Sequence, residues 1–278
     1  MDLTTYSITS DSIFYTVWQK DQDGNLAAVS VFEDIHPEYF TITNSNYNIS
    51  TGESGCEVKL TTAVVGKLTV PAYINNQKVI ALRSSASDNP SSDIRDPNLA
   101  SVTHVFFEPV NENGDVNIRD IVANTFRQCT ALKYVQFSAK GLRRIGERAF
   151  QNVKNLIDAH TLVGTFTMIE KNAFTRAFAP PETSDDMLII GGNVTDFGNA
   201  CFSNWNDFGD NDKFAVLQIG TADEPCPVLY FPTGTNSIFV NNGGRIKKVV
   251  FYTTDPSNAL FSSNGNYETL YRTLFNSI

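Results

Sequence analysis

Arg144-Ile-Gly-Glu-Arg-Ala-Phe150 is one of four similar stretches in the chain. The others are Asp120-Ile-Val-Ala-Asn-Thr-Phe126, Met168-Ile-Glu-Lys-Asn-Ala-Phe174 and Asp196-Phe-Gly-Asn-Ala-Cys-Phe202. In each of them an apolar residue precedes a Phe by five positions, and a small or short residue usually stands just before that Phe. Self-similarity of this kind is the signature of a repeat architecture, so these stretches decide the fold.

The four Phe residues set the period. They are separated by 24, 24 and 28 residues. The four extra residues fall in Ala179-Pro-Pro-Glu-Thr-Ser-Asp-Asp186, whose composition is that of a loop. A period in the twenties predicts a solenoid with one strand and one compact turn or short helix in each repeat. Stacking of the repeats then aligns their apolar residues into one continuous core.

A second apolar pattern follows each Phe. Its last two positions alternate, as in a short strand with one buried face. We expect the following residues to point inward: Leu132, Val135 and Phe137, then Leu156, Ala159 and Thr161, and then Met187 and Ile189. The residues between them should point outward.

These stretches resemble a known repeat. Ile145-Gly-Glu-Arg-Ala-Phe150, followed by Asn155-Leu156, is similar to the leucine-rich repeat of the bacterial surface-protein A type (BspA-like). Ala123-Asn-Thr-Phe-Arg-Gln-Cys-Thr-Ala-Leu132 fits the same repeat, with Cys129 at the family's Cys position. The resemblance is strong over residues 118–178 and weaker from residue 179 onward.

A partial resemblance continues upstream, in residues 66–82. The opening unit of this family has a strand that ends in an apolar residue and Pro, then a short hairpin and a second apolar pair. Val70-Pro71 and Val79-Ile80 hold those places. The resemblance implies a β-rich α/β solenoid, namely a leucine-rich-repeat right-handed superhelix of short strands and short helices or turns. Members of the family are commonly adhesins or host-binding proteins, so the resemblance also implies a binding role.

The two ends of the chain depart from the repeat. Residues 1–55 hold two expected strands, Ile13–Trp18 and Leu26–Val31, which indicate an N-terminal β cap or attachment segment. Residues 56–252 are the expected solenoid. In residues 253–278 apolar side chains recur at helical spacing after Asn266, which predicts a C-terminal helix. Solenoid ends must hide their last apolar face, so capping is the simpler role and docking to a partner is the alternative.

Charge and hydropathy exclude two kinds of partner. The chain of 278 residues carries a formal net charge of −9, and such an acidic surface repels phosphate backbones. No run of apolar residues reaches the length of a transmembrane helix. The first ten residues lack the pattern of a secretory signal, so either a signal has been removed or the protein reaches its site by another route. The four cysteines match no zinc pattern and are expected to be buried free thiols.

No constellation for catalysis or for a cofactor emerges. His36, His104 and His160 lie in separate parts of the chain, and no motif pairs any of them with a Ser or Cys nucleophile. We expect no metal site either. Carboxylates do gather at Asp207, Asp210 and Asp212, which could ligate Ca²⁺, but their spacing is not that of an EF-hand. A solvated loop is the simpler interpretation.

The remaining hypothesis is binding through the strand face of the solenoid. The expected outward residues of that face are Tyr134, Gln136, Asp158, His160 and Leu188. Their mixed chemistry suits a protein or glycan ligand, although ordinary surface residues would look the same. The sequence thus predicts an adhesin-like, non-enzymatic protein, extracellular or at the cell surface. The alternative is a structural component of a virion or another large assembly, docking through residues 1–55 or 266–278.

Overall fold

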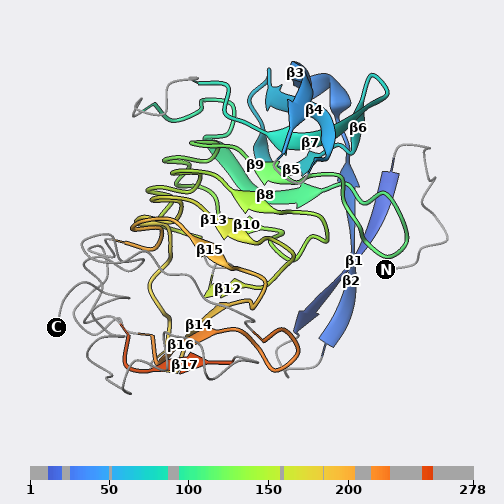
Figure 1. Ribbon diagram of the computed structural model, residues 1–278. Helices are drawn as coiled ribbons and strands as arrows, with labels where there is room; N and C mark the ends of the chain where they lie inside the picture. The colour runs from blue at the N-terminus through green and yellow to red at the C-terminus, as the bar shows by residue number, and fades with distance from the viewer. Residues whose placement is uncertain are drawn as a thin grey trace.

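A computed structural model describes residues 12–20, 26–49, 52–86, 94–156, 160–183, 185–203, 214–225 and 246–252. Short strands are stacked one above another along most of the molecule, and a long hairpin lies to one side of the stack (Figure 1). Within the described ranges the strands form three sheets besides that hairpin. The stack is the solenoid that the repeat period predicts.

The first sheet joins the strand that opens each repeat to the N-terminal part of the chain. Its order is β15 (Asp196–Phe197), β13 (Met168–Ile169), β11 (Arg144–Ile145), β9 (Asp120–Ile121), β7 (Gln77–Leu82), β4 (Ser54–Leu60) and β3 (Phe40–Asn48), and β6 (Tyr73–Ile74) also pairs with β7. From β4 to β15 the pairs along this order are parallel, whereas β3 is antiparallel to β4. A segment of the expected cap therefore continues the solenoid sheet.

The second strand of each repeat builds two further parallel sheets. One contains β5 (Val65–Val70), β8 (Ser101–Phe107) and β10 (Tyr134–Val135), and the other contains β12 (Thr161–Leu162), β14 (Met187–Ile190), β16 (Val216–Ile219) and β17 (Val249–Phe251). Each repeat thus crosses from the first sheet to a second strand and returns. Beside this stack, β1 (Ser12–Lys20) and β2 (Leu26–Asp34) pair as an antiparallel hairpin, which confirms the two strands expected there.

A corner turn follows each of the strands β9, β11, β13 and β15. Backbone hydrogen bonds join the turns of successive repeats: Phe126 N donates to Ala149 O (2.8 Å), Phe150 N to Ala173 O (2.8 Å) and Phe174 N to Cys201 O (2.7 Å). The same position of each turn has a positive φ, namely +62° at Asn124, +56° at Arg148, +56° at Asn172 and +55° at Ala200. Asn tolerates this left-handed conformation, whereas at Arg and Ala it strains the backbone. The surrounding ladder of hydrogen bonds offsets that strain.

Stacked phenylalanine rings fill the centre of the solenoid. Ring centroids lie 5.3 Å apart between Phe126 and Phe150, 5.1 Å between Phe150 and Phe174, and 5.5 Å between Phe174 and Phe202. All four rings are fully buried. Beside them runs the buried column of Ile121, Ile145, Ile169 and Phe197, held in register by the parallel pairs of the first sheet. The two columns confirm the repeat alignment.

The second apolar pattern is confirmed in its first copy and in part of its second. Leu132, Val135, Phe137 and Leu156 are buried as predicted, and Ala159 lies outside the described residues. In the next two copies the prediction is wrong by one residue, because the buried residues include Leu162 in place of Thr161, and Leu188 and Ile190 in place of Met187 and Ile189. Leu162 lies six residues after Leu156, whereas Phe137 lies five after Leu132. That extra residue reverses the faces of the strand, and the pairing of Leu162 with Ile190 passes the shift to the next repeat.

Other expectations have mixed outcomes. The repeats consist mostly of strands and turns, and the described ranges contain no α-helix, so the expected short α-helices are not found there. A three-residue 3-10 turn, η2 (Pro37–Tyr39), precedes β3. The predicted C-terminal helix lies outside the described residues, and the right-handed superhelix stays a prediction. Cys56, Cys129 and Cys201 are buried and free, as expected, whereas Cys226 is not among the described residues. No helix in the described ranges is long and apolar enough to cross a membrane.

Substitution of the central ring tests the stack. Phe150 contacts Phe126 and Phe174 face to face and Phe137 edge-on. Phe150→Ala should lower the free energy of unfolding by about 3–5 kcal/mol, because removal of a buried aromatic ring leaves a cavity. Urea denaturation measures the change. Val65→Ala is the control, since Val65 is 83% exposed. An equal loss of stability in the two variants would contradict the repeat alignment.

Candidate functional site

The outward face of the β5–β8–β10 sheet carries a cluster of aromatic side chains. The pairing register places Lys67, His104 and Tyr134 in one row across the three strands. The ring of Phe106 lies 5.2 Å from Tyr134 and 6.4 Å from His104, between ring centroids, and Lys67 Nζ lies 5.9 Å from the Phe106 centroid. We call Lys67, His104, Phe106 and Tyr134 the aromatic row. Phe106 and Tyr134 are partly exposed.

Gln136 fixes the edge of this row. Its side-chain Oε1 accepts a hydrogen bond from Phe107 N (3.0 Å), and its own backbone N donates to Val105 O (3.0 Å). These two hydrogen bonds join β8 to the residue that follows β10, so the pairing extends past the end of β10. The partly exposed Gln136 is therefore held in a fixed position beside the aromatic row.

The chain after β10 carries the outward pattern further. Val135, Phe137 and Ala139 are buried, whereas Ser138 and Lys140 between and after them are exposed. Outward side chains thus follow one another from Tyr134 through Gln136 and Ser138 to Lys140. Because a strand residue advances the chain by about 3.3 Å, this line is at most about 20 Å long.

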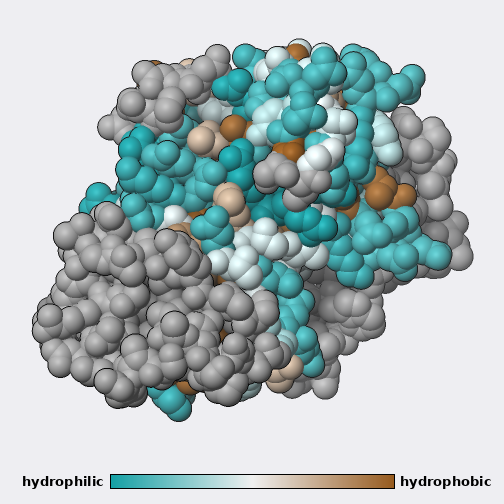
Figure 2. Space-filling model, viewed as in Figure 1, coloured by the Kyte–Doolittle hydropathy of each residue, from teal (hydrophilic) through white to brown (hydrophobic). Residues whose placement is uncertain are grey.

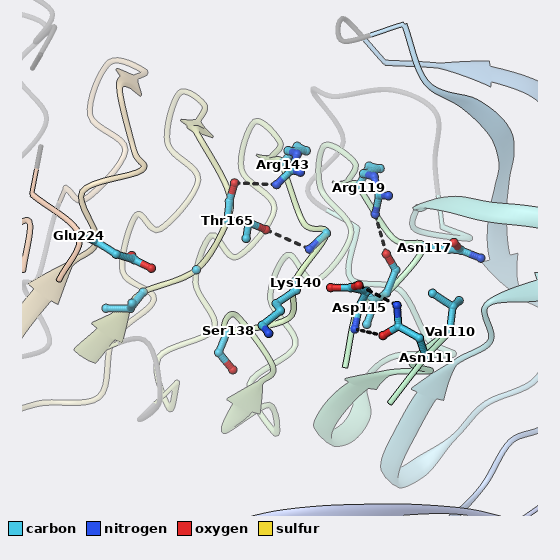
Figure 3. Close-up of a pocket in the computed structure, with 14 residues that line it drawn as sticks. Val110, Asn111, Asp115, Asn117, Arg119, Ser138, Lys140, Arg143, Thr165 and Glu224 are labelled. Atoms are coloured by element: carbon cyan, nitrogen blue, oxygen red, sulfur yellow. Dashed lines mark hydrogen bonds between the residues drawn. The ribbon is translucent and has the colours of Figure 1, made fainter. Parts of the chain in front are cut away.

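The line ends in a groove of about 640 Å³ that runs along the edge of several repeats (Figure 3). The loops that precede β9, β11 and β13 form most of its wall. Eleven of its 14 lining residues are polar, charged or Gly, and the three apolar ones are Val110, Val116 and Val163. Where Figure 2 colours the surface by hydropathy, it is mostly hydrophilic, with small separate apolar areas. Such a surface suits a ligand that forms many hydrogen bonds.

Two arginines of the groove stand at equivalent positions of successive repeats. Arg119 Nε donates to Glu53 Oε2 (2.6 Å), and its Nη1 donates to Val116 O (2.6 Å) and Ile118 O (3.2 Å). Arg143 Nη1 donates to Thr165 O (3.1 Å). A guanidinium group has five N–H donors, so these bonds orient both groups and leave donors for a ligand.

Small polar side chains hold the loops of the groove together. Thr165 Oγ1 donates to Leu142 O (2.8 Å), and one repeat later Asn193 Nδ2 donates to Gly164 O (2.8 Å). Gly141 occupies the equivalent position one repeat earlier and has no side chain. The Arg119 guanidinium takes that space, since a Cβ on Gly141 would lie 2.5 Å from Arg119 Nη1 and 2.5 Å from Val116 O. Gly141 thus makes room for an arginine of the groove.

A second, charged cluster lies on the outward face of the first sheet, over a cavity of about 290 Å³. The Asp120 carboxylate is fully buried and accepts hydrogen bonds from the Tyr47 hydroxyl and from Arg144, while Arg144 Nη1 also donates to Glu170 Oε1 (2.9 Å). Burial raises the pKa of Asp120, although Arg144 opposes that shift. Burial and the Asp120 charge raise the pKa of Tyr47, so its hydroxyl stays protonated and donates. The cluster ties β3 to β9, to β11 and to Glu170, the residue that follows β13.

The sequence-predicted site residues are only partly brought together. Tyr134 and Gln136 share one outward face, as expected, but Leu188 is fully buried, and that prediction is wrong because β14 is shifted by one residue. His160 is half-buried: its Nε2 lies 2.9 Å from Ala179 O and its ring packs edge-on at 4.9 Å from Phe214. Asp158 lies outside the described residues, as do Asp207, Asp210 and Asp212.

Sequence reasoning missed the groove. Its signal was the alternation that continues past β10 to Ser138 and Lys140, together with the 24-residue separation of Arg119 and Arg143. Neither signal shows that the loops before β9 and β11 face a common hollow. Within the described residues no group of three or more His, Cys, Asp or Glu side chains could hold a metal ion.

Comparison with known proteins gives one match. Residues 112–209 match the family model described as the BspA type leucine rich repeat region, with six copies. No curated protein and no solved structure matches the chain significantly. The matched residues contain the strands β9, β10 and β11 and most of the groove wall.

Gly141→Ala tests the close packing behind the groove. The substitution should lower the free energy of unfolding by about 2–3 kcal/mol, because the new methyl group meets Arg119 and Val116 and because the φ of +155° is unfavourable for Ala. Thermal denaturation measures it. Gly114→Ala is the matched control, since its φ is +74° and its Cβ would meet nothing within 4 Å. Equal losses of stability in the two variants would show that only the backbone conformation of Gly141 matters, and not its packing against Arg119 and Val116.

The half-buried His160 predicts a pH dependence of stability. Burial lowers the pKa of His160 below its ordinary value, so near pH 6.5 the unfolded chain binds a proton that the folded chain does not. The free energy of unfolding should therefore fall as the pH drops below about 6.5. Urea denaturation at pH 7.5, 6 and 5 measures this loss, which should be smaller in His160→Gln. An identical loss in wild type and variant would contradict the assignment.

Proposed function

We propose that this chain, whose residues 112–209 belong to the BspA-type leucine-rich repeats, is an adhesin-like, non-enzymatic binding protein that recognises a protein or glycan. Repeats of this kind generally mediate binding. The single observation that carries the proposal is the line of outward side chains from Tyr134 to Lys140, which joins the aromatic row to the groove. We call the aromatic row, Gln136, Ser138 and the groove together the binding surface.

The chemistry of this surface supports binding. Phe106 and Tyr134 offer flat apolar area with little conformational freedom to lose on association. Gln136, Arg119 and Arg143 are already held by hydrogen bonds, so a ligand would not bear the cost of ordering them. The surface is fixed by stacked repeats on a rigid backbone, and such preorganisation favours affinity.

The cellular place and the domain division belong to the same proposal. BspA-type repeats are typically surface-associated, so we place the protein outside the cell or at the cell surface. We also keep residues 1–55 as a cap or attachment segment, 56–252 as the solenoid and 253–278 as a C-terminal cap. Pairing of β3 with β4 supports a capping role for the first segment, since it extends the solenoid sheet by one antiparallel strand.

A bulky side chain in the middle of the binding surface tests the proposal. Ser138 is exposed between Gln136 and Lys140, so Ser138→Trp should weaken capture of any ligand of this surface by at least about tenfold without lowering stability. Immobilised wild type and variant are screened against one panel of glycans and extracellular proteins. Lys171→Trp, at an exposed site on the corner turn after β13, is the matched control.

Two results would contradict this placement of the function. Wild type that captures nothing from the panel argues against a binding role, and equal capture by both Trp variants means that the binding site lies elsewhere.

Fractionation of the natural source with an antibody to this chain tests the cellular location of the protein. Signal at the envelope or in the medium fits the adhesin, whereas signal in virus-like particles identifies an assembly component.

A further inference from the structure

We propose that the binding surface takes an acidic glycan, that is, a chain of sugars carrying carboxylate or sulfate groups at intervals. This inference deepens the proposed function and rests on it. It is carried by the placement of two cations at one end of the surface, of aromatic rings at the other, and of carboxylates on both sides of the cations.

The two cations are Lys140 and Arg143. In the part of the chain that the structure describes, neither forms an ion pair with a carboxylate: Lys140 Nζ donates to Asn113 O (3.2 Å) and Arg143 Nη1 to Thr165 O (3.1 Å). Arg119 differs, because Glu53 already balances its charge at 2.6 Å. At the centre of the groove, Lys140 and Arg143 therefore have no carboxylate at ion-pair distance among the described residues, in a protein whose net charge is −9. A ligand with an anionic group supplies the missing partner.

Carboxylates on either side limit the charge density of the ligand. Asp115 lies on one side of Lys140 and Glu224 on the other (Figure 3). The positively charged part of the groove is therefore confined to the surroundings of Lys140 and Arg143. A polymer with a charge on every unit, such as a single-stranded nucleic acid, would place phosphates against these carboxylates. A glycan with acidic groups at intervals would instead place hydroxyl groups there, which donate hydrogen bonds to carboxylates.

The rest of the surface favours sugars over an acidic peptide. Protein partners usually insert large apolar or aromatic anchors into apolar pockets, and the apolar lining of the groove consists of valines. Hydroxyl and amide side chains such as Ser138, Asn117 and Thr165 line it instead. At the other end of the line Phe106 and Tyr134 present partly exposed rings, which pack against the apolar face of a sugar ring. One extended polar ligand can contact both ends.

The overall acidity of the chain does not prevent this contact. Exposed charges more than a Debye length apart are largely screened, and that length is about 8 Å at physiological ionic strength. The charges within the groove therefore act most strongly on a bound anionic group, and repulsion from the rest of the surface is weak. The affinity should fall as the salt concentration rises, because salt also screens the charges of the groove.

Titration calorimetry with matched oligosaccharides tests the inference on the full chain. The probes are a hyaluronan tetrasaccharide and an unsulfated chondroitin tetrasaccharide, in which every second sugar carries a carboxylate, each beside its carboxyl-reduced neutral form. We expect at least one acidic probe to bind and its neutral form to bind about tenfold more weakly or not at all. The double variant Lys140→Gln/Arg143→Gln should bind the acidic probe about tenfold more weakly than wild type.

Control variants make the result specific. Arg95→Gln/Lys171→Gln removes the same two charge types at exposed sites outside the groove and should keep the wild-type affinity. Lys140→Gln alone leaves the Arg143 bond intact, so a folding defect in the double variant would not obscure the test.

Four outcomes overturn the acidic glycan. The first is that acidic and neutral forms bind equally, and the second is that the groove and control variants lose equal affinity. The third is that a thymidine oligonucleotide or a poly-glutamate peptide binds as tightly as the sugars. The fourth is that no sugar binds. Equal binding of neutral sugars would leave the proposed binding function standing. With no sugar bound at all, capture of a protein in the Ser138→Trp panel would still support that function, and an empty panel would end both proposals.

Discussion

The stacking of Phe126, Phe150, Phe174 and Phe202 is the interaction on which the rest of the structure depends. Ring centroids separated by 5.1–5.5 Å lie slightly farther apart than the spacing of about 4.8 Å that backbone hydrogen bonds impose on adjacent strands. One ring per repeat can therefore stack without a gap, and no repeat buries its ring alone. The rings also fix the corner turns, because Phe126 N, Phe150 N and Phe174 N donate across to the next turn. Positive φ angles at Arg148 and Ala200 persist because this ladder offsets their strain.

Once the core is fixed, each outward position becomes a column along the solenoid. Lys67, His104 and Tyr134 come from three distant parts of the chain and form one row because their strands are parallel and in register. Arg119 and Arg143 are brought together in the same way by the 24-residue period. A binding surface can thus be assembled from single residues of many repeats without a dedicated domain. For the same reason, no local sequence motif identifies it.

The sequence allowed prediction of the features that depend on the apolar period. The Phe column and the inward Val135 and Phe137 were readable because burial demands apolar side chains at a fixed interval. The strand face after residue 156 was not, because one extra residue before Leu162 reverses the faces without changing the composition, and Leu188 therefore proved to be buried. The groove was also beyond reach. Lys140 and Arg143 look like ordinary surface charges until the fold shows that their loops share a hollow, and Gly141 shows its role only beside Arg119.

Native-state hydrogen exchange tests the central claim that the stacked rings form one cooperative core. The amides of Phe126, Phe150 and Phe174 each bond to the next repeat, so their exchange requires separation of the stack. The account predicts slow exchange with similar free energies of opening at all three, which fall together when denaturant is added. Fast exchange at any of the three, or three unrelated opening free energies, would mean that the repeats are independent and would contradict the account.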